Sequence, residues 1–175
     1  MIIIVGLGNP GKKYSNSRHN AGWMVLDTLT GKIDWKDNEK YQAFVYTTEL
    51  ENKEVELLKP NTFMNNSGIA VAYALKKYPK SRLIVVHDDK DIPLGEIRVQ
   101  HDRSAAGHNG VKSIIEHIGT QDFTRVRIGI APSDKMLIED TADFVLENFT
   151  KEEKNILNQA IEKSLLEIRQ LVMQN

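Results

Sequence analysis

The sequence predicts an α/β fold, a three-layer sandwich in which helices cover both faces of a mixed, mostly parallel twisted sheet. Two continuous apolar runs, residues 2–5 (IIIV) and 83–86 (LIVV), are typical of strands buried in the centre of such a sheet. Segments with apolar residues at helical spacing follow the strands, as expected for helices packed on the sheet. Segments that alternate apolar and polar residues indicate antiparallel strands, which argues against a purely doubly wound fold.

In the first half of the chain, the expected order is strand, helix, hairpin, helix. The expected elements are a strand at 2–5, a helix at 22–29, an irregular surface connection at 33–41, antiparallel strands at 43–48 and 55–58, and a helix at 67–77. Gly31 and Pro79 supply the helix stop signals. The short polar turn Glu51-Asn52-Lys53 joins the two strands of the hairpin.

The second half is expected to contain strands at 83–86, 96–100 and 125–130, a loop at 101–109 and a helix that ends at Gly119. The strand at 96–100 is predicted to lie at an edge of the sheet. In the strand at 125–130, apolar residues are predicted to point inward and the arginines outward. The last helix starts at the capping box Thr150/Glu153, and its apolar stripe is predicted to pack on the sheet.

Length and composition limit the classes of protein that the chain can belong to. We expect residues 1–175 to form a single domain, since chains of about 150 residues bury roughly 70% of their unfolded surface. With 23 Lys+Arg against 24 Asp+Glu, the net charge is -1, so a nucleic-acid site must be a local basic patch. The absence of cysteine excludes disulfides, thiolate metal sites and a cysteine nucleophile. With no signal-peptide pattern and no long apolar run, we expect a soluble, cytoplasmic protein without a membrane partner.

Gly6, Gly8 and Gly11 have the spacing of the dinucleotide-binding fingerprint, but their context does not fit. That fingerprint requires a helix directly under the glycines, so that its amides reach a pyrophosphate. Pro10 removes one amide and favours an extended Asn9, and the first helical pattern starts too late. We therefore predict a rigid turn that presents Asn9 at the end of a buried strand.

Three clusters of polar residues follow predicted strands or precede predicted helices, and we expect them to converge on one rim of the sheet. The clusters are Asn9 with residues 18–20 (RHN), residues 63–65 (FMN), and residues 87–88 (HD) with 107–110 (GHNG). Taken alone, Asn65 is typical of a helix cap and Asn109 of a left-handed turn. Together the clusters offer histidine, carboxylate and amide groups, without a serine in a nucleophile elbow.

This combination predicts hydrolysis by an activated water molecule rather than through a covalent intermediate. A neutral histidine accepts the proton of the water while a carboxylate on the other ring nitrogen fixes the tautomer, and such base catalysis contributes roughly 10²–10⁴-fold. Asparagine amides can hold the water and stabilise the oxyanion, the latter by roughly 3–4 kcal/mol per donor.

As a set, the motifs resemble the bacterial peptidyl-tRNA hydrolase family. The matching segments are residues 6–11 (GLGNPG), Tyr14, 18–22 (RHNAG), 60–68 (PNTFMNNSG), 87–89 (HDD), 107–110 (GHNG) and 125–130 (RVRIGI). The resemblance implies a cofactor-independent and metal-free enzyme that cleaves the ester between a peptidyl group and the 3′ ribose of tRNA, which recycles tRNA from stalled or dropped-off translation. It implies a cytoplasmic monomer that binds the acceptor stem and 3′ end of peptidyl-tRNA.

The resemblance also implies roles for individual residues. His19 would be the general base, Asp88 its orienting carboxylate, and Asn9 would position substrate and water. Asn65 and Asn109 would bond the peptide and the catalytic water. The cleft would further be lined by Tyr14, Phe63, Met64 and His108.

The tRNA phosphates would bind at Arg127, Arg98, Arg103 and Lys112. The chain departs from the family at two places here. Residues 102–106 (DRSAA) occupy a loop that is typically glycine-rich in the family. Gln100 stands where a lysine commonly clamps a phosphate together with the arginine at position 127, and Arg98, His101 or Arg103 are candidates to replace that lysine.

Two hypotheses from other classes remain open at this point. A catalytically silent RNA-binding module could retain the fold, although the joint presence of Asn9, His19, Asp88 and Asn109 opposes it. Metal-dependent hydrolysis could use His87, Asp88 and Asp91, although no paired histidines at helical spacing accompany them.

Overall fold

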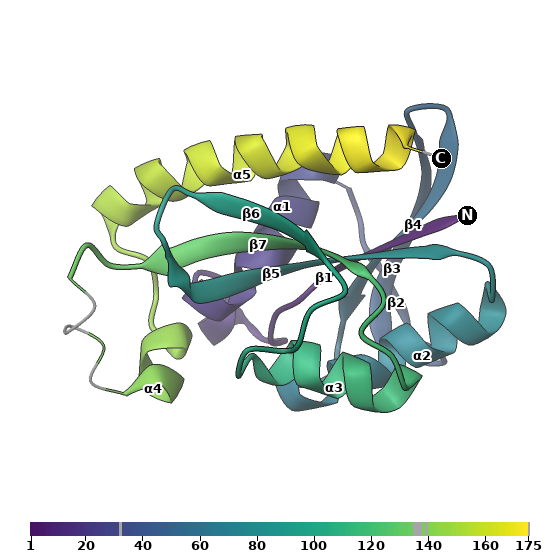
Figure 1. Cartoon of the computed structure of the whole chain (residues 1–175), viewed down its shortest axis with the longest axis horizontal. Coiled ribbons are helices and arrows are strands. Elements are labelled where there is room, and N and C mark those ends of the chain that lie inside the picture. Colours follow the sequence, from purple (N-terminus) through teal and green to yellow (C-terminus); the bar gives the residue numbers. More distant parts are fainter. Residues whose placement is uncertain (32, 135–137, 139, 175) are drawn as a thin grey trace.

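A computed structural model of the chain describes residues 1–31, 33–134, 138 and 140–174. A twisted seven-stranded sheet with strand order β2-β3-β4-β1-β5-β7-β6 forms its middle layer. Figure 1 shows α2 and α3 on one face of this sheet and α1 and α5 on the other, which confirms the predicted α/β sandwich. Among the described residues, no helix has the length and apolar character needed to span a bilayer.

The strands are β1 (Ile2–Gly6), β2 (Lys36–Asn38), β3 (Ala43–Leu50), β4 (Lys53–Pro60), β5 (Arg82–Pro93), β6 (Ile97–His101) and β7 (Thr124–Ala131). The α-helices are α1 (Ala21–Thr30), α2 (Ser67–Lys77), α3 (Asn109–Ile118), α4 (Thr141–Leu146) and α5 (Lys151–Met173). Short 3-10 turns are η1 (Lys12–Tyr14), η2 (Arg18–Asn20) and η3 (Met64–Asn66).

The sheet is mixed because a parallel centre is flanked by antiparallel strands. β1 pairs in parallel with β4 and β5, and β5 pairs in parallel with β7. The predicted hairpin β3–β4 and the edge strand β6 on β7 are antiparallel, as expected. In β1, Ile2 and Ile4 belong to the core under α1 and α5, while Ile3 and Val5 belong to the core under α2 and α3. Burial on both faces explains the continuous apolar run.

Most helices match their sequence patterns closely. α1 ends before Gly31 with a positive φ of 68°, and α3 ends at Gly119 in the left-handed conformation. α5 has the complete predicted capping box, in which the Thr150 hydroxyl accepts from the Glu153 amide and the Glu153 carboxylate accepts from the Thr150 amide. No α-helix opens under the glycine turn, in agreement with the prediction.

Three elements differ from the sequence prediction. Residues Lys36–Asn38, expected to be irregular, form the edge strand β2. Three polar residues in a row show no alternation of apolar and polar side chains, so the sequence does not indicate this strand. β5 was expected to end at Val86 but continues to Pro93, so that His87 and Asp88 lie within the strand rather than after it. The six-residue helix α4 has no counterpart in the predicted elements.

The prediction that the arginines of β7 point outward is wrong for Arg125. Val126 and Ile128 do face the core under α5, so Arg125 and Arg127 lie on the opposite face of the strand. That face is covered at Arg125, which is only 2% exposed because the loop between β6 and α3 lies over it. The guanidinium of Arg125 donates to the Ser104 carbonyl at 2.8 Å.

α1 packs unusually close to the sheet at Gly22, and this contact sets the position of the preceding turn η2. A Cβ atom at Gly22 would lie 2.3 Å from the Val86 carbonyl oxygen and 2.5 Å from the Leu7 nitrogen. Both neighbours are backbone atoms of the sheet centre, so they cannot rotate away.

We expect Gly22→Ala to lower the free energy of unfolding by about 1–3 kcal/mol, because the added methyl group must push α1 off the sheet. Chemical denaturation followed by circular dichroism would measure the loss. Thr28→Ala on the exposed face of the same helix is the matched control and should change stability by less than about 0.5 kcal/mol. Equal stability of both variants would contradict the close contact.

Candidate active site

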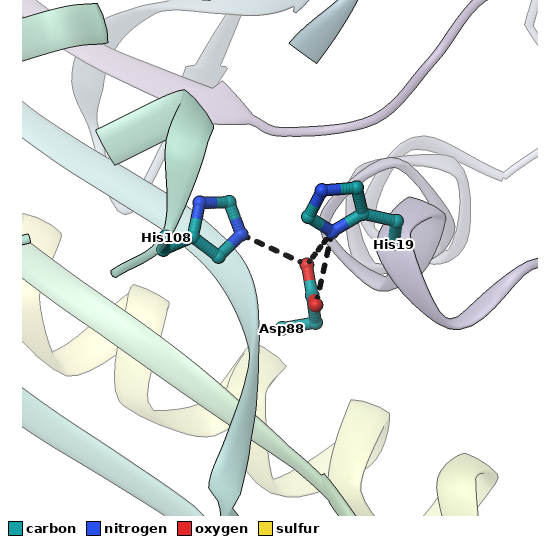
Figure 2. Close-up of side chains that lie close together, drawn as sticks. All are labelled: His19, Asp88 and His108. Carbon is teal, nitrogen blue, oxygen red and sulfur yellow. Dashed lines mark hydrogen bonds and ion pairs between the residues drawn. The ribbon is translucent and has the colours of Figure 1, made fainter. Parts of the chain in front are cut away.

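Two histidines and one carboxylate from three separate elements meet beside the central strands (Figure 2). His19 comes from η2, Asp88 from β5, and His108 from the N-cap of α3. Nδ1 of His19 lies 2.9 and 3.0 Å from the two carboxylate oxygens of Asp88, and Nε2 of His108 lies 3.0 Å from Oδ1. The predicted meeting of His19 with Asp88 is therefore confirmed, and His108 joins them.

The hydrogen bonds fix the tautomers of both rings. A carboxylate only accepts, so His19 donates from Nδ1 and His108 donates from Nε2 to Asp88. His108 uses its other nitrogen to accept the backbone N–H of Val111 at 3.3 Å. In neutral His19, Nε2 then carries a lone pair and is turned away from Asp88 (Figure 2). This ring nitrogen is able to accept a proton.

Burial and charge pull the pKa values of this group in opposite directions. Burial alone disfavours the imidazolium and lowers the pKa of His19, but the charge and hydrogen bond of Asp88 outweigh it, and the pKa is raised above 6.5. Burial also raises the pKa of Asp88, which is 2% exposed. The attraction and hydrogen bonds of the two histidines overcome this and hold the Asp88 pKa far below its ordinary value. Asp88 therefore stays ionised at any physiological pH.

His87 is a buried, neutral histidine next to this group. Its Nδ1 donates to the Asp88 carbonyl at 2.7 Å, and its ring packs edge-on against His108 with centroids 4.6 Å apart. Burial, with a further contribution from His108, lowers the pKa of His87 well below 6.5. His87 therefore supports the His108 ring instead of adding a charge.

The set considered for a metal, His87 with Asp88 and Asp91, is not brought together. Within the described part of the chain, the group close enough to share an ion is His19, Asp88 and His108. An ion there would have to displace the protons that both rings direct at Asp88. It would also place a protonated Nδ1 of His108 against the N–H of Val111. The ring N–H groups of His19 and His108 are therefore better suited to hydrogen bonds with Asp88 than the ring nitrogens are to binding an ion.

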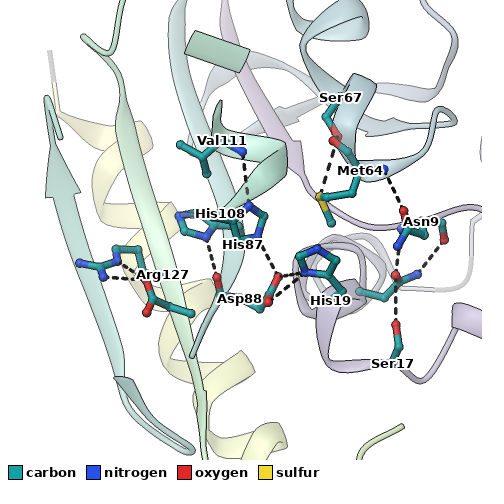
Figure 3. Close-up of polar contacts among 12 residues, drawn as sticks. Asn9, Ser17, His19, Met64, Ser67, His87, Asp88, His108, Val111 and Arg127 are labelled. Atoms are coloured by element: carbon teal, nitrogen blue, oxygen red, sulfur yellow. Dashed lines mark hydrogen bonds and ion pairs between the residues drawn. The ribbon is translucent and has the colours of Figure 1, made fainter. Parts of the chain in front are cut away.

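Asn9 is held on the other side of His19 by a second polar group (Figure 3). The Asn20 side chain accepts from the Asn9 backbone N–H at 2.9 Å and donates to the Asn9 carbonyl at 3.0 Å. The side-chain oxygen of Asn9 accepts the Met64 N–H at 2.8 Å. These contacts leave the Asn9 amide NH₂ as a donor of fixed direction. No role was predicted for Asn20 from the sequence. Its amide side chain next to His19 was the feature that could have indicated one.

An open cavity of about 200 Å³ begins at this group. His19, Asp88, His108 and Asn109 form one side, and Thr141, Ala142 and Val145 of α4 form another. The contribution of α4 was not foreseen, because a helix of six residues has no clear period. Five residues predicted for the site do not line this cavity: Asn9, Tyr14, Phe63, Met64 and Asn65. Phe63 is 60% exposed and Asn65 is also exposed, whereas Met64 is buried.

The basic residues predicted to bind phosphates differ in their availability. Arg127 is already paired, since its Nη2 and Nε lie 2.6 and 2.8 Å from Oδ2 of Asp89 and its Nη1 donates to Gln100. Arg98, Arg103 and Lys112 are exposed. Lys112 lies 3.8 Å from Glu116 in the next turn of α3.

Positive charge is concentrated near β7 even though the chain as a whole is slightly acidic. Burial lowers the pKa of Arg125, and the neighbouring charges of Arg127 and Arg103 lower it further while Asp89 opposes them. Arg98 pairs directly with Arg127 across β6 and β7, so both side chains lie on the same face.

The loop that departs from the glycine-rich pattern is fastened to the sheet. In addition to the Arg125–Ser104 contact, the Asp102 amide donates to the Phe123 carbonyl and Gln121 donates to the Asp102 carboxylate. Asp102 and Ala106 have φ values of 51° and 48°. Such left-handed conformations cost a non-glycine residue roughly 1–2 kcal/mol. The loop thus keeps a conformation suited to glycine without glycine at these positions.

Comparison with known proteins identifies the family of the chain. The sequence matches the family model described as peptidyl-tRNA hydrolase over residues 3–175. The peptidyl-tRNA hydrolase of Thermodesulfovibrio yellowstonii is 44% identical over 170 residues, which cover 94% of this chain and 89% of the relative. That of Fervidobacterium nodosum is 48% identical over 161 residues, covering 91% and 83%.

The fold is similar to solved structures of the same kind. The Arg119Gln mutant of peptidyl-tRNA hydrolase from Acinetobacter baumannii is 36% identical, with a TM-score of 0.89 over 98% of this chain and 88% of that one. A second structure, of the enzyme from the same organism, is 34% identical with a TM-score of 0.88 and the same coverage. The chain therefore belongs to the peptidyl-tRNA hydrolase family, a family of hydrolases.

Proposed function

We propose that this enzyme hydrolyses the ester between a peptidyl group and the 3′ ribose of tRNA with a water molecule activated by His19, without a covalent intermediate. The observation that carries the proposal is the fixed tautomer of His19. Asp88 accepts from Nδ1, which leaves Nε2 as a base at the edge of the cavity. A serine or cysteine nucleophile would need such a base beside it, and none of the residues that line this cavity is a serine or cysteine.

In this mechanism, water donates a proton to Nε2 of His19 as its oxygen attacks the ester carbonyl. The resulting imidazolium is stabilised by the ionised Asp88 next to it. Asn9 would position the substrate and the water, and Asn109, which lines the cavity, would bond the catalytic water. An amide that also donates to the oxyanion stabilises it by roughly 3–4 kcal/mol in comparable sites. When the intermediate collapses, the proton on Nε2 moves to the 3′ oxygen of the ribose, and His19 returns to its neutral form.

The same amides give a reason for selecting N-blocked substrates. A peptidyl group offers a neutral amide to Asn9, Asn65 and Asn109, and an unblocked aminoacyl group offers a charged ammonium instead. Leaving polar groups unpaired in a binding site penalises the wrong substrate strongly. His108 lines the cavity, and Tyr14, Phe63 and Met64, which lie outside it, would contact the peptide and the terminal nucleotide beyond the cavity.

The tRNA itself would be bound by Arg98, Arg103, Arg127 and Lys112. Charge concentrated near β7 supports this assignment, because phosphate binding depends on local cations. We infer that the chain acts as a single-domain monomer in the cytoplasm, where it recycles tRNA from stalled or dropped-off translation and contacts the acceptor stem and 3′ end.

We expect the protein to release N-acetyl-amino acid from N-acetylaminoacyl-tRNA and to cleave the unblocked aminoacyl-tRNA far more slowly. His19→Ala should reduce kcat by about 10²–10⁴-fold, because the base is lost. His117→Ala, at an exposed position near the end of α3, is the control and should keep full activity. A chelator should have no effect.

Each other outcome of this assay points to a different hypothesis. Binding of tRNA without any cleavage would support the silent RNA-binding module. Activity lost to the chelator and restored by a divalent metal would support metal-dependent hydrolysis. Full turnover in His19→Ala would remove His19 from its role.

The pKa of His19 should depend on Asp88. In the unsubstituted protein the group titrates above 6.5, so the fraction of active, neutral base rises with pH through that value. In Asp88→Asn, burial remains and the stabilising charge is gone, so the His19 pKa should fall below 6.5 and the acid limb of kcat/KM should move to lower pH. Nuclear magnetic resonance titration of the His19 ring would measure the shift.

Asp91→Asn is the matched control for this titration, because Asp91 lies on the same strand with its side chain 53% exposed. It should leave the His19 titration where it is. An unshifted pKa in Asp88→Asn would contradict the proposed stabilisation of the imidazolium.

The double variant Arg103→Ala/Lys112→Ala should weaken tRNA binding and reduce the slope of log K against log salt by about 1 for each phosphate that is no longer neutralised. Both residues are exposed, so the fold should not change. Lys36→Ala on β2, at the opposite edge of the sheet, is the control. A salt slope equal to that of the control would show that Arg103 and Lys112 do not bind phosphate.

A further inference from the structure

Arg18 is a buried cation directly before His19. Both terminal nitrogens of its guanidinium bond the C-terminal part of the chain, while its Nε has no hydrogen-bond partner among the described residues. The residue is 5% exposed. Nη2 lies 3.1 Å from both carboxylate oxygens of Glu153, and Nη1 lies 3.0 Å from Glu147 and 3.2 Å from the Phe144 carbonyl oxygen. The guanidinium also stacks over the Phe144 ring at 4.3 Å. One side chain therefore binds α4, the segment after it and the first turn of α5.

Backbone contacts join the same two segments. The Arg18 amide donates to the Glu147 carbonyl at 3.0 Å, and the Phe149 amide donates to the Asn16 carbonyl at 3.1 Å. Ser17 and Asn148 form an isolated antiparallel bridge between these bonds. The turn that carries His19 is thus paired with the chain between α4 and α5, and Arg18 clamps the pair from the side.

α4 has a second contact with the site, because it lines the same cavity as His19. Thr141, Ala142 and Val145 line that cavity, and the Phe144 carbonyl bonded by Arg18 lies between them in the sequence. Figure 1 shows α4 at the same end of the molecule as the start of α5. The guanidinium therefore connects the turn that carries His19 with the wall of the cavity.

We propose that Arg18 is a positioning residue that holds His19 against Asp88 and holds the α4 wall over the cavity. This inference rests on the proposed hydrolysis. Buried ion pairs add little net stability compared with apolar residues of the same volume, because desolvation offsets the attraction. The Arg18 guanidinium is planar and bonds two carboxylates and a carbonyl, so it fixes the geometry of the segments that carry them.

A substitution in the far half of α5 allows the positioning role to be separated from plain stability. Ile168 is fully buried in the core under α5 and lies fifteen residues after Glu153 in that helix. Ile168→Val removes one buried methyl group and leaves the capping box and the Arg18–Glu153 pair in place. It destabilises α5 without touching the clamp and is therefore the matched control for Arg18→Lys.

Arg18→Lys keeps the positive charge and loses the planar guanidinium with its two terminal nitrogens. We expect kcat on N-acetylaminoacyl-tRNA to fall by about 10–100-fold, since small displacements of catalytic groups cost that much. The KM should rise most for bulky aminoacyl groups that reach the α4 wall. The pKa of His19, measured by nuclear magnetic resonance without substrate, should fall as the bond to Asp88 loosens. Glu147→Gln, at an exposed carboxylate, is a milder variant and should move all three quantities in the same direction by a smaller factor.

Ile168→Val should lower the melting temperature while kcat, KM and the His19 pKa stay unchanged. The inference is overturned if Arg18→Lys and Glu147→Gln change only the melting temperature, or if Ile168→Val reduces kcat as much as they do. Because the His19 titration needs no substrate, it tests the clamp even if the unsubstituted protein fails to cleave peptidyl-tRNA. That failure would count against the proposed function instead.

Discussion

The arrangement of the site depends on one buried carboxylate that accepts hydrogen bonds from two imidazoles. Asp88 is 2% exposed, and a charge so buried is strongly unfavourable unless it is paired and hydrogen-bonded. His19 and His108 supply both bonds and come from opposite directions, one from the turn before α1 and one from the start of α3. Because Asp88 lies inside β5, the ladder with β7 fixes its position, and the two histidines must be brought to it.

The sequence meets this demand through close backbone packing on one side and a helix cap on the other. Gly22 lets α1 approach the carbonyl of Val86 closely. This contact places η2 beside β5, near the point where the pairing of β5 with β1 ends. His108 caps α3 through the Val111 amide, so its ring can point only one of its nitrogens at Asp88. On the far side of His19, Asn20 holds Asn9 by both of its backbone groups. His19 therefore lies between the ionised Asp88 and the fixed amide of Asn9.

Sequence patterns reveal those parts of this arrangement that are local or repeated along the chain. Apolar runs identify β1 and residues 83–86 in the first half of β5. The carboxyl ends of these two runs lie side by side, which brings His19 and Asp88 together even though β5 continues beyond Asp88. Periodicity does not reveal what covers a surface: Arg125 was expected outside and is buried by a loop whose path depends on contacts distant in sequence. The wall formed by α4 and the clamp at Arg18 rest on partners more than 100 positions away, which no local signal indicates.

The second acidic residue of β5 explains how two adjacent carboxylates can serve different purposes. Consecutive strand residues point to opposite faces, so Asp89 turns away from the histidines and meets Arg127 instead. That ion pair compensates the Asp89 charge, and the charge of Asp88 is left to act on His19. A phosphate that displaced Asp89 from Arg127 would leave the Asp89 carboxylate charged and unpaired, so the negative charge near His19 would increase and the His19 pKa would rise. The Arg127–Asp89 pair must therefore stay intact if an anion bound near β7 is to leave the basicity of His19 unchanged.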